Sequence, residues 1–191
     1  LTIKADVRKR AEVKNMMKQA KTEFKTCDTL INCAGINRDK KFLDLTDKDW
    51  NSVVDTHLKG TFICSQEFIR NLEPNKGSII TIGANCGLSG RKNGANFCSS
   101  KGAIFALTKC MARELAPQIR VNCIVPSAIL TDEVIERYSL DTDEGIVGVT
   151  KGLPIGRLGT TQEFVKMTEM IIQATYSTGQ NFFVNGGELM Q

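Results

Sequence analysis

The sequence predicts an α/β domain, a doubly wound parallel sheet with helices on both of its faces. Short apolar segments such as Thr29–Asn32 and Ser78–Ile82 lack the alternation of a half-exposed strand, so they are typical of strands buried on both faces. Between them lie long segments, such as Asp47–Arg70, whose apolar residues recur about every 3.6 residues, as in an amphipathic helix. Strands and helices in alternation predict βαβ units and therefore a parallel sheet.

The chain is predicted to form one domain over residues 1–191. Thr46 followed by acidic residues is an N-cap pattern that predicts a helix start, and the same holds near Thr161. The predicted elements are, in order, a strand over Leu1–Ala5, a helix over Arg8–Phe24, a strand over Thr29–Asn32, a helix over Asp47–Arg70, a strand over Ser78–Ile82, a helix over Ala103–Leu115, a strand over Arg120–Val125, a polar irregular segment over Asp132–Leu153, a helix over Thr161–Ala174 and a strand over Gly179–Val184.

Composition narrows the classes of function. The net charge is +4 and the basic residues are spread along the chain, so nucleic-acid binding is not expected. No apolar run approaches the ~20 residues that a membrane helix needs, and we expect no membrane partner. The 7 cysteines include no C-x-x-C pair, which favours small buried hydrophobic residues in a reducing cytosol over a metal site or a disulfide.

The stretch Gly77–Lys109 is the centre of the predicted site. It is expected to form a buried strand, a glycine-rich loop and a helix that carries Lys101 on its first turns. This arrangement presents side chains at the carboxyl edge of a parallel sheet. Another candidate segment, Asn32–Gly35, follows the preceding strand, where Gly35 lets the backbone turn sharply.

With these segments the chain resembles the short-chain dehydrogenase/reductase family, most closely its 3-oxoacyl carrier-protein reductase branch. The resemblance implies a Rossmann-like fold and covers nearly the whole chain. Matching segments share the family's order and spacing, which makes the resemblance specific: Asp6–Val7, Asn32–Gly35, Gly77–Gly83, Gly94–Asn96, Lys101, Ala112–Ala116, Arg120–Asn122, Pro126–Thr131, Pro154–Gly159, Thr178–Gly179 and Val184–Gly187.

One part of the family pattern does not occur in this sequence. The family begins with a strand and a Thr-Gly-x-x-x-Gly-x-Gly loop that holds the cofactor's pyrophosphate at a helix start. The family's first βαβα portion would precede Leu1. Because a parallel sheet without its central strand would leave apolar faces exposed, we expect the native gene to encode this portion.

The resemblance also implies a set of catalytic positions. In the family a Ser and a Tyr contact the substrate carbonyl, the Tyr gives a proton, a Lys lowers the Tyr pKa and an Asn keeps a relay water. The matching residues in this chain are Ala84 for Ser, Phe97 for Tyr, Lys101 for Lys and His57 for Asn. Because Ala84 and Phe97 lack the two hydroxyls that contact the substrate, stabilisation of a developing oxyanion should fall by several kcal/mol.

Three alternatives for the missing proton donor stay open. His57 carries an imidazole, a group that ordinarily titrates near neutral pH, Tyr138 lies in the polar segment after a predicted strand, and Ser99 or Ser100 carries a hydroxyl near Phe97. Lys101 also has two interpretations, a ligand of the cofactor ribose, which we favour, or a solvated helix lysine.

A nicotinamide cofactor is implied by the resemblance, NADP or NAD, with NADP favoured because the reductase branch uses it. No metal is expected. The implied contacts are Asp6 and Val7 at the adenine, Asn32, Ala34 and Gly35 on the adenosine side, Lys101 at the ribose, and Ile129 with Thr131 at the carboxamide.

The leading functional prediction is an NAD(P)H-dependent reductase of a 3-oxoacyl thioester or similar carbonyl, as in fatty acid biosynthesis, that is weak or inactive because of Ala84 and Phe97. The alternatives are a non-catalytic nucleotide-binding, regulatory or structural subunit, and a pure assembly module. All three predict a cytoplasmic homo-oligomer, a tetramer or a dimer. Residues 130–155 are expected to form a substrate lid, while Arg91 and Lys92 either meet an acidic carrier protein or stay solvated.

Overall fold

The computed structural model describes residues 1–72 and 76–190, and its centre is a four-stranded parallel sheet in the order β1-β2-β3-β4. In register, Leu30 lies opposite Ile79, and Ile79 lies opposite Val121. The sequence prediction of a parallel α/β sheet is confirmed. The strands are β1 (Thr29–Asn32), β2 (Gly77–Ile82), β3 (Ile119–Pro126) and β4 (Asn181–Val184).

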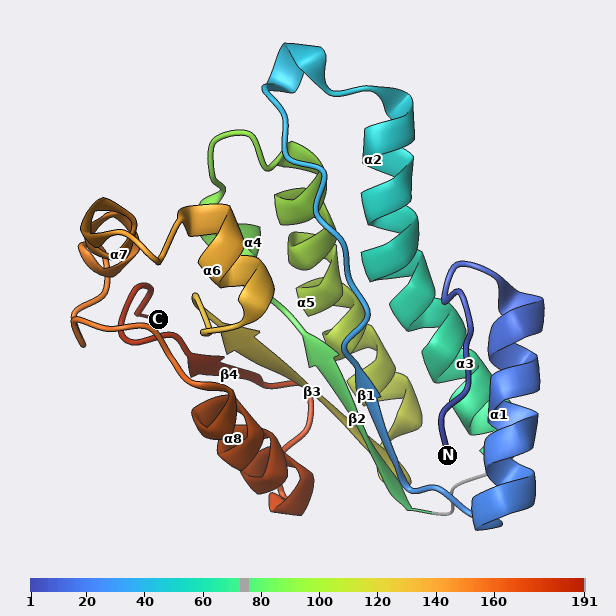
Figure 1. The fold of residues 1–191 in the computed structure, drawn as a ribbon. Coiled ribbons are helices and arrows are strands. Elements are labelled where there is room, and N and C mark those ends of the chain that lie inside the picture. Colours follow the sequence, from blue (N-terminus) through green and yellow to red (C-terminus); the bar gives the residue numbers. More distant parts are fainter. Residues whose placement is uncertain (73–75, 191) are drawn as a thin grey trace.

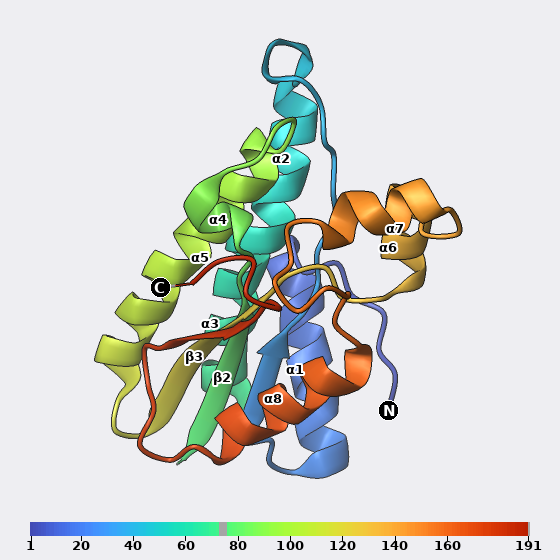
Figure 2. The ribbon, with the colours of Figure 1, turned by 90° about the vertical axis from the view of Figure 1, so that its left-hand side faces the viewer.

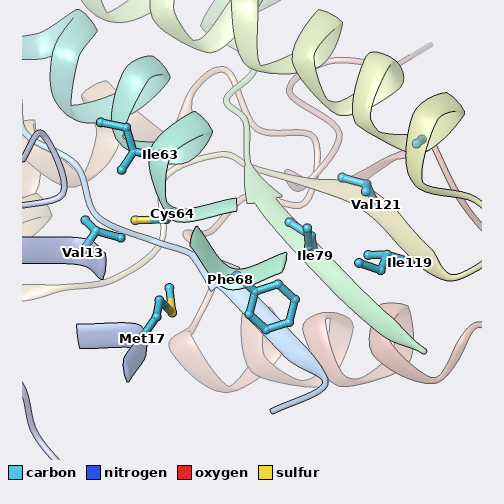
Figure 3. Close-up of a cluster of buried hydrophobic side chains, with 9 residues drawn as sticks. Val13, Met17, Ile63, Cys64, Phe68, Ile79, Ile119 and Val121 are labelled. Atoms are coloured by element: carbon cyan, nitrogen blue, oxygen red, sulfur yellow. The ribbon is translucent and has the colours of Figure 1, made fainter. Parts of the chain in front are cut away.

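Helices cover both faces of this sheet (Figures 1 and 2). On one face, Ile79 and Val121 belong to a core cluster shared with α1 (Arg10–Phe24), α3 (Gly60–Leu72) and α5 (Ala95–Leu115). Figure 3 shows the side chains of this cluster, where Phe68 is 1% exposed. On the other face, Ile80 and Ile124 pack against Ile171 of α8 (Thr161–Gln173). Alternate residues of each strand therefore pack into separate cores on the two faces of the sheet.

The segment predicted as one helix over Asp47–Arg70 is helical throughout, but it contains a π turn. Helix α2 (Asp47–Val54) passes into the π turn η2 (Asp55–Lys59) and then directly into α3. Thr46 caps the start, because its hydroxyl accepts from the backbone N–H of Asp49 while the Asp49 carboxylate accepts from the N–H of Thr46. The π turn carries the buried His57.

Several predicted boundaries need correction. Leu1–Ala5 is not a strand, because a strand needs a hydrogen-bonded neighbour and no described residue pairs with this segment. The polar segment Asp132–Leu153 is not irregular: its threonine-capped turns form α6 (Asp132–Tyr138) and α7 (Asp143–Thr150). The last helix is capped by Thr160. The other short elements are η1 (Phe42–Asp44) and α4 (Cys86–Ser89).

The short helix α4 lies directly against α5 through two glycines. A Cβ on Gly87 would be 2.8 Å from the backbone nitrogen of Gly102, and a Cβ on Gly102 would be 3.0 Å from the Gly87 carbonyl oxygen. Such distances leave no room for a methyl group. The glycine-rich loop thus holds the backbone of α4 against the turn of α5 that follows Lys101.

No helix among the described residues is both long enough and apolar enough to cross a membrane.

We predict that Gly87→Ala lowers the free energy of unfolding by about 1–3 kcal/mol, because the added methyl group must push α4 away from α5. Gly148→Ala is the matched control: Gly148 lies inside α7, and a Cβ there meets nothing within 4 Å. That variant should be neutral or slightly stabilised. Urea unfolding of both variants provides the measurement, and equal effects would contradict the close contact.

Candidate functional site

Lys101 is buried at the carboxyl end of β2. Its side chain is 7% exposed, and Nζ donates to the carbonyl oxygen of Ile82 at 2.7 Å. Burial lowers the pKa of Lys101 to about 8, because the charged form loses its hydration. The interpretation of Lys101 as a solvated helix lysine is therefore wrong.

The ring of Phe97, one helical turn before Lys101, is surrounded by nitrogen groups. Lys101 Nζ lies 5.5 Å from the ring centroid and the Arg91 guanidinium carbon lies 5.1 Å from it. The His57 ring meets Phe97 edge to face at 5.1 Å. Both cations are placed where the negative face of an aromatic ring attracts them. The structure therefore brings Phe97, Lys101 and His57 together.

His57 is held by the loop that follows β1. Its Nε2 lies 2.8 Å from the carbonyl oxygen of Ile36 and 3.1 Å from the Ile36 nitrogen. We assign the proton to Nε2 from the shorter contact, which leaves Nδ1 as a buried acceptor without a partner among the described residues. Gly35 makes this possible, since a Cβ there would lie 2.4 Å from His57 Cε1.

Burial lowers the pKa of His57 to about 4, and the positive charge of Lys101 acts in the same direction. The backbone hydrogen bond to Ile36 opposes this shift only in part. His57 is therefore a neutral imidazole near pH 7, with its proton directed at a backbone carbonyl. This state does not suit it to give a proton to a substrate.

The other proton-donor candidates differ in position. Ser100 is buried, and its hydroxyl donates to the Asn96 carbonyl within α5. Ser99 is exposed on the same helix. Tyr138 ends α6 and lies within electrostatic reach of Arg91. The hydroxyl of Ser100 is thus already engaged within α5, whereas those of Ser99 and Tyr138 stay candidates.

Arg91 has a role that the sequence did not reveal. Its guanidinium is only partly exposed, and it pairs with Asp39 at 2.9 Å while lying over Phe97. Burial works to lower the pKa of Arg91, but the Asp39 carboxylate, Cys86 and Tyr138 raise it above its usual value. Arg91 is therefore not a freely solvated cation. In the sequence, the only indication of this position was a basic residue inside a glycine-rich loop.

Four of the predicted cofactor residues meet in one cavity. Asp6, Val7, Ala34 and Gly35 line a space of about 570 Å³. Arg8 donates to both carboxylate oxygens of Asp6, and this pairing lowers the Asp6 pKa to about 2. One wall of this cavity thus carries an acidic and an apolar side chain.

The remaining predicted cofactor residues lie elsewhere. Asn32 does not line this cavity, and its amide donates to the Ser65 hydroxyl at 3.3 Å. Ile129 forms a β-bridge with Gly159, and the Thr131 hydroxyl caps α6 by accepting from the Val134 nitrogen. The neighbouring Ser127 and Ala128 line a second cavity of about 610 Å³.

Two further contacts at this edge were not predicted. Glu188 Oε2 accepts from the Asn85 amide at 2.7 Å and from the Ser127 hydroxyl at 2.5 Å, so the C-terminal segment joins the loops after β2 and β3. Among residues 1–72 and 76–190, no group of three or more His, Cys, Asp or Glu side chains could hold a metal ion.

Comparison with known proteins gives a consistent picture. A family model described as enoyl-(acyl carrier protein) reductase matches residues 1–188. The chain is 34% identical over 192 residues to the 3-oxoacyl-[acyl-carrier-protein] reductase FabG of Staphylococcus epidermidis, covering 98% of this chain and 77% of that protein. The Escherichia coli K12 protein of the same name is 33% identical over 184 residues, covering 94% of this chain and 74% of that protein.

A solved structure is similar over the whole chain. It is titled short-chain dehydrogenase/reductase SDR, glucose/ribitol dehydrogenase, from Brucella melitensis. The TM-score is 0.92 at 28% sequence identity, and the match covers 100% of this chain and 77% of that one.

The single histidine gives a direct test of the buried site. Its folded-state pKa of about 4 lies below the ordinary 6.5, so the unfolded chain binds the proton first as pH falls. This contribution to stability is complete above about pH 7 and is lost as pH falls towards 4. Between about pH 7 and pH 5 we expect a loss of about 2 kcal/mol in the free energy of unfolding.

Denaturant unfolding at the two pH values measures this loss, and NMR of the one imidazole measures the pKa itself. His57→Asn is the control, because without an ionisable group the variant should lose most of the dependence in this range. An imidazole that titrates near 6.5 in the folded protein would contradict the predicted burial.

Proposed function

Because the chain belongs to the short-chain dehydrogenase/reductase family and is related to 3-oxoacyl carrier-protein reductases, we propose that it is a nicotinamide-nucleotide-binding reductase whose reduction of carbonyls, of the 3-oxoacyl thioester type, is weak. The surroundings of Phe97 carry this proposal. A phenyl ring fills the position between His57, Lys101 and Arg91, and Ala84 adds no hydroxyl. General acid catalysis needs an ionisable donor within reach.

The cavity lined by Asp6, Val7, Ala34 and Gly35 supports binding of the adenosine end of NADP or NAD. We favour NADP because the reductase branch uses it. The nicotinamide, when bound, would supply hydride to the substrate carbonyl. Ile129 and Thr131 are proposed to hold the carboxamide, and Asn32 to support the adenosine side from β1.

Lys101 is proposed to hold the hydroxyls of the cofactor ribose. The carbonyl of Ile82 orients its ammonium group, and burial keeps the chain of methylenes in one place. In this family the same lysine also lowers the pKa of a tyrosine. Lys101 has no such effect here, because Phe97 carries no hydroxyl. Binding of the nucleotide and loss of efficient proton transfer are therefore compatible in one site.

A non-catalytic relative is the second candidate, a nucleotide-binding, regulatory or structural subunit. It is favoured by the neutral state of His57 and by the engagement of Ser100 within α5, which remove two of the candidate proton donors. Either candidate fits a cytoplasmic homo-oligomer, a dimer or tetramer, with residues 130–155 as a lid. We also propose that Lys92, which is exposed, offers a positive charge to an acidic carrier protein.

We predict that NADPH binds and that Lys101→Met weakens its binding by about 10- to 100-fold, because a charged hydrogen bond contributes about 1.5–3 kcal/mol. Lys109→Met is the matched control, since Lys109 is exposed on the same helix. Fluorescence of Trp50, the single tryptophan, reports binding, because its neighbours Asp49 and Ser52 line the cavity. Absence of binding by the unaltered protein would leave only a scaffold function.

We also predict that Ala84→Ser combined with Phe97→Tyr raises the turnover of NADPH with a 3-oxoacyl thioester by roughly 10²-fold or more, since positioned general acids contribute about 10²–10⁴-fold. Phe42→Tyr adds a phenol at an exposed site and should have no effect. NADPH oxidation followed by absorbance gives the rate. If the unaltered protein already turns over as fast as the double variant, the proposed weakness is wrong.

A further inference from the structure

Glu188 joins two loops of the candidate site through one carboxylate oxygen. Its Oε2 accepts from the Asn85 amide at 2.7 Å and from the Ser127 hydroxyl at 2.5 Å. Asn85 directly follows Ala84 in the loop after β2. Ser127 comes directly after β3, which ends at Pro126. A side chain of the C-terminal segment therefore connects the loops that leave two neighbouring strands.

The segment that carries Glu188 is itself held by a buried side chain, Asn185. The Asn185 amide donates to Asn85 Oδ1 at 3.2 Å and to the Leu189 carbonyl oxygen at 2.7 Å, and its own Oδ1 accepts from the Gly187 nitrogen at 3.0 Å. Asn185 is 8% exposed and Asn85 is 5% exposed. Glu188 lies at the surface, but these two buried amides fix where its carboxylate can be.

The loop after β3 depends on this carboxylate near its start. The Ser127 nitrogen donates to the Val184 carbonyl oxygen at 3.3 Å, which is longer than most such hydrogen bonds. The contact between the Ser127 hydroxyl and the carboxylate, at 2.5 Å, is the closer of the two attachments. Ile129 follows two residues later and is bridged to Gly159. A displacement of Ser127 would therefore also move the chain that leads into Ile129.

We propose that Glu188 is a positioning residue for the nicotinamide end of the site. The inference rests on the proposed function, in which Ile129 and Thr131 hold the carboxamide. Glu188 acts through its two partners, because it keeps the loop after β3 at a fixed separation from the loop after β2, which carries Ala84. Loops that already have the separation needed by a ligand bind it more tightly, since less conformational freedom is lost on binding.

The adenosine end of the site does not share these contacts. The proposed adenosine residues Asp6 and Gly35 line the cavity of about 570 Å³, and the described residues around that cavity do not include Asn85, Ser127 or Glu188. Loss of the carboxylate should therefore weaken contacts at the nicotinamide and leave those at the adenosine unchanged. This difference separates a positioning role from a general effect on stability.

The test compares the binding of two nucleotides to the full chain by isothermal titration calorimetry. NADPH carries a nicotinamide, and 2′-phospho-ADP-ribose matches it except that the nicotinamide is missing. We expect Glu188→Ala to weaken the binding of NADPH by about 3- to 10-fold, the range for the loss of one hydrogen bond. Binding of 2′-phospho-ADP-ribose should stay the same. Equal weakening of both nucleotides, or of neither, would overturn the proposal.

Two further variants make the result specific. In Glu188→Gln the amide oxygen can replace Oε2, because both donors meet a single oxygen, and NADPH binding should return to the level of the unaltered protein. Glu169→Ala is the matched control, since it removes an exposed carboxylate from α8, and it should bind both nucleotides as before. A glutamine variant as weak as the alanine variant would contradict a role through these two hydrogen bonds.

Failure of the proposed function gives a different result. In that case the unaltered protein binds neither nucleotide, and the role of Glu188 falls with the function. If the unaltered protein binds NADPH and Glu188→Ala binds it equally well, the proposed function stands and only the positioning role is wrong.

Discussion

The attachment of α5 to β2 is the constraint on which the rest of the site depends. Three contacts fix it: the hydroxyls of Thr81 and Thr108 lie 2.7 Å apart in the core, Lys101 donates to Ile82 at the strand end, and a Cβ on Gly83 would meet the Phe105 ring at 2.6 Å. Because these polar and apolar contacts hold α5 in place, they also fix the position of Phe97 on that helix. Because α5 and β2 are closely packed, the side chains of the site are held as rigidly as the core.

Burial governs the electrostatics of the site more than any single charge pair. Burial shifts both Lys101 and His57 towards their neutral forms, and the charge of Lys101 further disfavours a charge on His57. Arg91 keeps its charge because Asp39 accompanies it at the outer side. The site therefore has a charged rim and an interior in which burial disfavours further charge.

The sequence predicted those features that depend on neighbours in the chain. The strand β2, the cap at Thr46 and the amphipathic helices are local patterns, and they were found nearly in place. Strand pairing is not local, which is why Leu1–Ala5 was assigned wrongly. The contact of Arg91 with Phe97 depends on how a loop folds back on a helix, and the periodicity of the sequence carries no information on that.

The π turn η2 makes the long helix respond differently to the loss and the gain of a residue. The wider turn at Asp55–Lys59 accommodates one residue more than an α-helical turn would. Removal of a single residue there would leave an ordinary α-helical turn and keep the phase of the residues that follow. Insertion of a further residue would instead rotate them by ~100° about the helix axis, and Ile63, Cys64 and Phe68, which now point into the core, would turn towards the flank of the helix. The helix is thus more open to a deletion at η2 than to an insertion.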